Sequence, residues 1–125
     1  MATNRPTAGE LVDAVLDFLS AELHSELQEP SVKFKLRIAT NALKIVRREL
    51  TLSPAHESLE RSGIQALLQT GEDDIAALNR ELCKKIRQGD YDQDESELIE
   101  LLTRLTLNKL SIDNPGYSTY LALTP

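Results

Sequence analysis

The sequence predicts an all-α protein: a single domain over residues 1–125, folded as a bundle of about five helices. Apolar residues recur at helical spacing in several long segments, and the Gly and Pro residues, five of each, fall between those segments. No pair of alternating segments joined by a hairpin turn is present, so a β-sheet is not expected. The core must consist mainly of Leu, Ile, Val and Ala, because the chain has only two Phe, three Tyr and no Trp.

The first predicted helix spans residues 8–27. Thr7 and Glu10 have the spacing of a capping box, in which each side chain bonds the backbone N–H of the other residue. The apolar residues of this helix share one half of the helical wheel: Leu11, Val12, Val15, Leu16, Phe18, Leu19, Leu23 and Leu27. Residues 1–30 contain six acidic residues and one basic residue, so the helix is acidic. Residues 1–6 are expected to form a flexible arm.

The second predicted helix, residues 32–50, organises the fold. It holds six of the fourteen Lys and Arg residues, and no acidic residue precedes Glu49. Its apolar residues cover more than half of the wheel, which predicts a central helix in contact with several neighbours. Four basic residues, which we call the basic stripe, lie together on the remaining side: Lys33, Arg37, Lys44 and Arg48. The short break at Pro30 predicts an antiparallel αα-hairpin with one acidic and one basic helix.

The third predicted helix spans residues 54–69. Ser53 is a candidate cap, and Pro54 is expected at the first helical position, where its missing N–H costs nothing. Gly63 weakens the helix by about 1 kcal/mol relative to Ala. Gly71 is expected to end it.

The fourth predicted helix has the acidic residues 72–74 at its start and ends near Gly89. Its last turns carry three basic residues, Lys84, Lys85 and Arg87. Acids at the start of a helix and bases at its end match the helix dipole. Gly89 is expected to form a left-handed C-cap, because glycine adopts positive φ without a steric penalty.

The last predicted helix spans residues 94–110, with a stripe of Leu residues as its core side. Residues 111–117 contain Asx and Pro-Gly turn residues that stop the helix, and Asn114 is the structural polar residue of that turn. Residues 118–125 are expected to form an extended, flexible arm.

Charge and composition restrict the function classes. The net charge of −6 argues against a nucleic-acid partner, since such domains usually carry a large basic face. The single cysteine excludes an intramolecular disulfide and fits a cytoplasmic, reducing compartment. The N-terminus lacks the apolar core of a signal peptide, and no segment is apolar over the roughly 18 residues that a membrane helix needs, so no membrane association is expected.

No residue pattern predicts catalysis or a cofactor. His24 and His56 belong to no metal-binding helical motif, so no metal site is expected. Cys83 has no histidine near it in the sequence and is interpreted as a small buried thiol. There is no glycine-rich phosphate loop, and the acidic residues 90–97 lack the central glycine of a calcium loop. We therefore expect no catalytic residue, no cofactor and no enzymatic activity.

Three polar residues lie on or beside apolar stripes: Asn41, Asn79 and Lys109. A buried amide must find hydrogen-bond partners or cost about 1–3 kcal/mol. In one interpretation Asn41 and Asn79 join helices or hold a loop, and Lys109 extends its ammonium group to water. In the other, Asn41 and Lys109 converge with Arg37 and Arg48 on an anionic ligand. The basic stripe likewise either pairs with acids of this chain or docks an acidic or phosphate-bearing partner.

Several short blocks together resemble a known family. They are Arg5–Ala8 with Glu10–Leu11, Arg37–Leu43, Leu78–Arg80, Ile86–Gly89 and Asn108–Tyr117. In this combination the chain resembles, from Arg5 to about Tyr117, an uncharacterised family of small bacterial domains. Domains of that family are often encoded beside, or fused to, aminoglycoside-phosphotransferase-like kinases and acyl-CoA dehydrogenases. The resemblance implies an accessory role to such an enzyme, and it assigns no activity to any residue.

Two functional hypotheses follow. The first is a non-catalytic accessory domain that binds a phosphotransferase-like kinase or an acyl-CoA dehydrogenase through the basic stripe and residues 108–117. The alternative is a domain that binds an anionic metabolite, such as an acyl-CoA or a phosphate ester. Its candidate binding residues are Arg37, Asn41, Lys44, Arg48 and Lys109.

Overall fold

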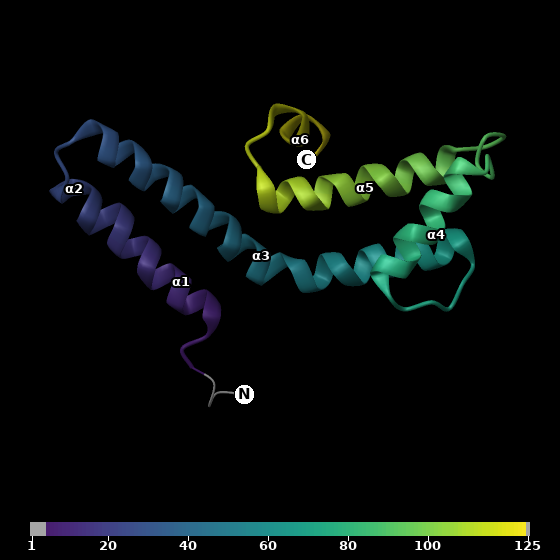
Figure 1. The fold of residues 1–125 in the computed structure, drawn as a ribbon, viewed down its shortest axis with the longest axis horizontal. Coiled ribbons are helices and arrows are strands. Elements are labelled where there is room, and N and C mark those ends of the chain that lie inside the picture. Colours follow the sequence, from purple (N-terminus) through teal and green to yellow (C-terminus); the bar gives the residue numbers. More distant parts are fainter. Residues whose placement is uncertain (1–4, 125) are drawn as a thin grey trace. The chain divides into compact units, whose positions relative to one another are not determined.

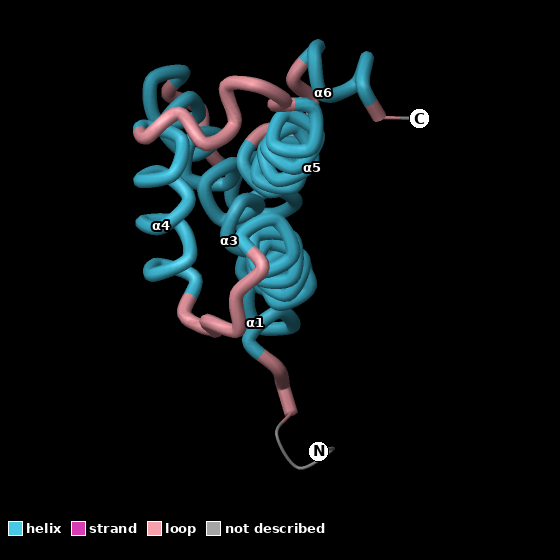
Figure 2. Tube along the Cα trace, turned by 90° about the vertical axis from the view of Figure 1, so that its right-hand side faces the viewer, coloured by secondary structure: helices cyan, strands magenta, loops and turns pink. Residues whose placement is uncertain are grey.

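The computed structural model describes residues 5–124, and within that range the chain forms helices and connecting segments only (Figure 2). The predicted all-α fold class is therefore confirmed. The elements are α1 (Ala8–Asp17), the π-helical segment η2 (Phe18–Leu23), α2 (His24–Glu26), α3 (Pro30–Leu68), α4 (Ile75–Arg87), α5 (Ser96–Asp113) and α6 (Ser118–Leu123). Of the N-terminal arm predicted at residues 1–6, the first four residues lie outside the described range, as does Pro125.

The chain divides into two compact units, residues 1–52 and residues 53–125. We call them unit 1 and unit 2. The long helix α3 contributes its first part to unit 1 and its last part to unit 2. Each unit has its own packing, and each is described in turn.

Unit 1 is a helical hairpin. The predicted first helix is confirmed as the continuous run α1–η2–α2, and it lies antiparallel beside the first part of α3 (Figure 1). The capping box is also confirmed: Glu10 N–H donates to Thr7 Oγ1 at 3.1 Å, and Thr7 N–H donates to Glu10 Oε1 at 3.0 Å. Arg47 of α3 donates from Nε to Asp13 Oδ1 of α1 at 2.9 Å and so joins the two arms.

The predicted helix break at Ser53 and Pro54 is wrong. A single helix of 39 residues, α3, runs through Pro54 in place of the two predicted helices. Proline removes one i→i−4 hydrogen bond, but the turns on both sides keep theirs, so the helix continues at a local cost. Ser53 does not act as a cap here, because its hydroxyl donates to the Glu57 carboxylate at 3.4 Å one turn later.

The wide apolar arc of α3 is not covered by several neighbours as expected. Within unit 1 the helix has one neighbouring helical arm, and the side away from that arm remains open. Phe34 is 56% exposed and Ile38 is 54% exposed. Thr40 is the buried residue among the described residues of unit 1, and its hydroxyl is satisfied by the Leu36 carbonyl oxygen at 2.8 Å.

Unit 2 contains the buried core. Ile64 of α3, Leu78 and Leu82 of α4, and Leu98 and Leu101 of α5 form one cluster. Ile64 and Leu78 are fully buried, and a buried side chain of this size stabilises a fold by about 1.5–3 kcal/mol. Three helices thus meet in one small core, to which α3 contributes one residue and α4 and α5 each contribute a pair one helical turn apart.

Gly63 explains how α3 and α5 approach each other. A Cβ atom at this position would lie 2.5 Å from Leu101 Cδ1, well inside carbon–carbon contact distance. The glycine that weakens α3 locally therefore makes room for the Leu101 side chain from α5.

The ends of the helices in unit 2 confirm one prediction and correct two. Gly89 has φ of +83° and follows α4 as the expected left-handed residue. Gln69, with φ of +55°, follows α3 in the role expected of Gly71. Residues 118–123, expected to be extended, form α6, whose first turn closes when Leu121 N–H donates to Tyr117 O at 3.0 Å.

Candidate functional site

The exposed side of α3 in unit 1 carries an aromatic ring beside basic residues. We call Phe34, Arg37, Ile38, Asn41 and Lys44 the outer face of α3. All five are exposed. The Arg37 guanidinium carbon lies 5.9 Å from the centroid of the Phe34 ring, within the range of a cation–π contact. Exposed aromatic and Arg side chains are the residues most often found at the energetic centre of protein interfaces.

The basic stripe is only partly exposed. Lys33 and Arg48 are half-buried, and Arg48 is engaged within the chain, whereas Arg37 and Lys44 are exposed. The ion pair that joins the hairpin uses Arg47, which lies outside the stripe. Arg47 also bonds Thr51 Oγ1, and its guanidinium lies against Gly9, where a Cβ atom would come within 3.1 Å. The wheel gave no sign of this contact, because Arg47 lies at the border between the apolar arc and the basic stripe and was assigned to neither.

Two of the polar residues that the wheel placed at apolar stripes are exposed. Asn41 lies on the outer face of α3 and Lys109 near the end of α5. Water satisfies both side chains, so neither carries the expected desolvation cost. Asn41, Arg37 and Arg48 belong to unit 1 and Lys109 belongs to unit 2. A shared pocket for these residues stays a prediction.

The two asparagines assigned to structure have definite partners in unit 2. The Asn79 amide donates to Glu60 Oε2 and to the Ile75 carbonyl oxygen, each at 3.0 Å, and so joins α4 to α3. Asn114 is the C-cap residue of α5. Its N–H donates to Leu110 O at 2.8 Å and its carbonyl oxygen accepts from Tyr117 N–H at 3.1 Å, which closes the turn after the helix.

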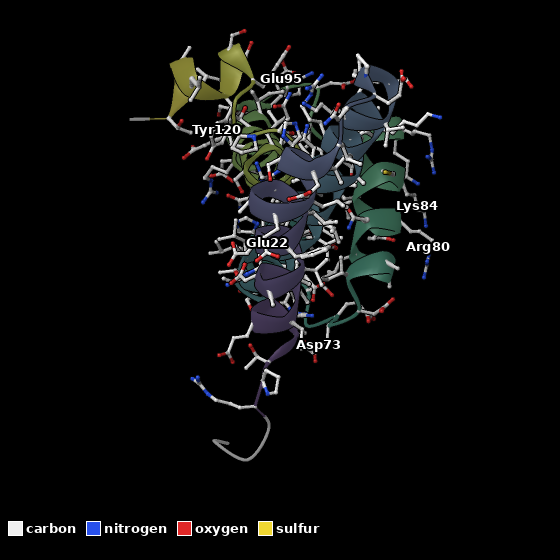
Figure 3. All side chains as sticks on the ribbon, turned by 90° about the vertical axis from the view of Figure 1, so that its left-hand side faces the viewer. Glu22, Asp73, Arg80, Lys84, Glu95 and Tyr120 are labelled. Atoms are coloured by element: carbon white, nitrogen blue, oxygen red, sulfur yellow. The ribbon has the colours of Figure 1, made fainter. Side chains whose placement is uncertain are left out.

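A second basic surface, absent from the predicted sites, lies on α4. Arg80, Lys84 and Arg87 are spaced i, i+4 and i+7 and therefore share one side of the helix. Figure 3 shows Arg80 and Lys84 pointing outward from the same side of α4. A groove of about 620 Å³ is lined by Ala77, Asn79, Arg80, Glu81, Cys83, Lys84 and Arg87. The sequence shows the basic cluster at the end of α4, but the helix dipole is sufficient to explain a cluster at that place, so the sequence alone does not indicate a binding surface.

Cys83 corrects another expectation. It is exposed beside this groove and is not a buried thiol. The core contacts α4 through Leu78 and Leu82, and Cys83 lies a quarter turn beyond that contact. His56 is half-buried on α3, and its Nδ1 is buried without a hydrogen-bond partner in the described chain.

Within residues 5–124, no group of three or more His, Cys, Asp or Glu residues is placed to hold a metal ion. No helix in this range has both the length and the apolar character needed to cross a bilayer.

Among the groups of residues 5–124, the pKa values of Tyr91 and Asp94 are shifted, and both residues lie in the segment before α5. The Ser96 hydroxyl and N–H donate to Asp94 Oδ1 at 2.7 and 3.1 Å, and these bonds lower the pKa of Asp94. Burial raises the pKa of the Tyr91 hydroxyl, and the positive charge of Lys85 opposes that effect. Neither group belongs to the outer face of α3 or to the α4 groove.

Comparison with known proteins places most of the chain in one family. The family described as Domain of unknown function (DUF6285) matches residues 25–117, well over half of the 125 residues. The match begins in α2 and ends directly before α6. No curated protein matches the chain, and no solved structure matches it. The chain therefore belongs to the DUF6285 family, whose members share a domain of unknown function.

Proposed function

We propose that this protein is a non-catalytic interaction domain that docks an enzyme on the outer face of α3. The observation that carries the proposal is the exposure of Phe34 and Ile38, 56% and 54%, beside the exposed cations Arg37 and Lys44. An isolated exposed apolar residue is ordinary, but an aromatic ring, a branched aliphatic side chain and two cations on consecutive turns form a compact mixed surface.

The composition of this surface fits a protein partner better than a small molecule. Protein interfaces are enriched in aromatic residues and Arg at their centre, with a polar rim that water still reaches. Here the Arg37 guanidinium lies near the Phe34 ring, so the partner would cover a planar cation and an aromatic ring together. The two cations favour a partner surface that is acidic around its apolar centre.

The partner class comes from the resemblance of the sequence to domains encoded with phosphotransferase-like kinases and acyl-CoA dehydrogenases. An accessory domain needs no active site of its own. This fits a chain whose main features are two exposed surfaces, the outer face of α3 and the basic surface of α4. Residues 108–117 form the second proposed contact. Within them Tyr117 is 47% exposed at the start of α6.

Affinity co-purification tests the proposal. The tagged full chain is expected to recover a phosphotransferase-like kinase or an acyl-CoA dehydrogenase of the same genome, identified by mass spectrometry. Phe34→Glu is expected to abolish that recovery, because a carboxylate replaces the apolar centre of the surface. Leu59→Glu is the matched control, since Leu59 is also on α3 and 57% exposed but lies outside the outer face. Recovery of neither enzyme, or equal recovery with both variants, contradicts the proposal.

The α4 groove favours a second candidate function, the binding of an anionic metabolite such as an acyl-CoA or a phosphate ester. Its volume of about 620 Å³ is within the range of small-ligand sites, and Arg80, Lys84 and Arg87 supply positive charge. Coenzyme A and inorganic phosphate are the probes. Either is expected to raise the melting temperature of the full chain, and Arg80→Ala is expected to remove the shift while Arg37→Ala keeps it. No shift with either probe excludes this function.

A further inference from the structure

Unit 1 has a second exposed apolar surface, separate from the outer face of α3. On α1, Leu11 and Val15 are 54% and 48% exposed, and Phe18 at the start of η2 is 49% exposed. On α3, Val46 and Leu50 are 42% and 44% exposed. We call these five residues the hairpin face.

The two groups lie side by side. The ion pair between Asp13 and Arg47 fixes the register of the antiparallel arms. With this register Val15 is level with Val46, and Leu11 is level with Leu50. At 100° per residue both groups fall on the same broad side of the hairpin, opposite to the side where Asp13 and the basic stripe lie.

We propose that the hairpin face binds the same face of a second copy of this chain, so that two hairpins form a four-helix bundle. Two packed helices cover only one side of each other, and a four-helix arrangement is the usual way to bury the remaining apolar side. This association goes beyond the docking of an enzyme, because it uses residues outside the outer face of α3.

The charge of the hairpin favours a second copy as the occupant. Residues 1–52 carry seven acidic and seven basic residues, so this unit has no net charge and two copies do not repel each other. Six of the acids precede Pro30 and six of the bases follow it. A two-fold axis parallel to the helices places the acidic arm of one copy over the basic helix α3 of the other. The basic stripe lies on the opposite side of the hairpin, so its charges are not buried between the two copies.

The area is also appropriate. Five large apolar side chains, each about half exposed, present roughly 400 Å² of apolar surface per copy. A stable interface takes about 800 Å² from each partner, and its centre is more apolar than its rim. The hairpin face supplies such a centre, and the charged residues of the two arms supply the rim.

The test is the oligomeric state of the full chain, measured by light scattering on a size-exclusion column. The expected mass is twice the 13.9 kDa of one chain. Val15→Glu is expected to reduce the mass to that of one chain, and Glu has a higher helix propensity than Val, so α1 itself is not weakened. Phe34→Glu is the matched control. It places the same charge on the outer face of α3 and is expected to leave the dimer intact.

Other results overturn the proposal. If the wild type is a monomer and Val15→Glu destabilises it, the chain covers the hairpin face with its own residues. If the wild type is a monomer and Val15→Glu does not change its stability, the face binds a different protein. A dimer that survives Val15→Glu uses another surface. The melting temperature of the wild type gives a check without any variant, since it rises with protein concentration only when folding is coupled to association. If the wild-type chain forms the dimer but recovers neither enzyme, the proposed function is contradicted and this inference stands.

Discussion

The contact between Gly63 and Leu101 gives a prediction with a definite sign. Gly63→Ala places a Cβ atom 2.5 Å from Leu101 Cδ1, about 1 Å closer than carbon atoms approach in ordinary contact. Leu101 is 4% exposed, so its side chain has little room to move. Overpacking of this kind costs about 1–3 kcal/mol. Ala stabilises a helix interior by about 1 kcal/mol relative to Gly, so the expected net effect is a loss of about 1 kcal/mol.

Urea denaturation followed by circular dichroism measures this free energy of unfolding. Gly71→Ala is the control, because a Cβ atom there meets nothing within 4 Å, and it is expected to be neutral or slightly stabilising. Leu101→Ala removes Cγ and both Cδ atoms, which are the three atoms within 4 Å of the new Cβ. In that background Gly63→Ala is expected to stabilise the protein. If Gly63→Ala stabilises the wild-type chain as well, α3 and α5 do not approach each other as described.

Three further predictions concern unit 2. Gln69→Gly is expected to stabilise the protein by about 0.5–1 kcal/mol in thermal unfolding, since glycine relieves the positive φ of 55°, and a destabilised variant would contradict that backbone conformation. Asn79→Ala is expected to cost about 1–2 kcal/mol in urea, because it leaves the half-buried Glu60 carboxylate without its donor, and an unchanged midpoint would show that this bond is unimportant. Ser96→Ala is expected to raise the pKa of Asp94 toward its ordinary value in an NMR titration. Because the pKa of Asp94 is lowered in the folded state, this carboxylate contributes to the stability of the fold above its unfolded-state pKa. That contribution is lost as the pH falls through the folded-state pKa. An Asp94 titration that Ser96→Ala leaves unchanged would refute the Ser96 contacts.

Local signals made most of the fold predictable. The capping box of Thr7 and Glu10 and the left-handed Gly89 depend on residues close in sequence, and both are confirmed. Helical periodicity likewise predicted the fold class, since it needs no knowledge of distant contacts. Pro54 shows the limit of such signals. A proline is equally compatible with a first helical turn and with a tolerated defect in a longer helix, and only the surrounding turns decide between them.

The surfaces were harder to predict, because a helical wheel gives the apolar side of a helix but not what covers it. Phe34 and Ile38 were assigned to the core and are exposed. Cys83 lies on the apolar flank of its wheel, yet the core contacts a neighbouring side of α4. Arg47, which joins α3 to Asp13 of α1, lies at the border between the apolar arc and the basic stripe, so its role was not apparent from the wheel. Each of these outcomes depends on which helix lies opposite, and that information is not local.

The central claim is that the outer face of α3 docks an enzyme, and a titration with purified proteins tests it most directly. The full chain is titrated by calorimetry into a purified phosphotransferase-like kinase and, separately, into a purified acyl-CoA dehydrogenase of the same genome. The account predicts saturable binding to one of them, lost in Phe34→Glu and retained in Leu59→Glu, two substitutions of similarly exposed residues on one helix. Absence of binding to both enzymes, or binding that Phe34→Glu leaves unchanged, would contradict it.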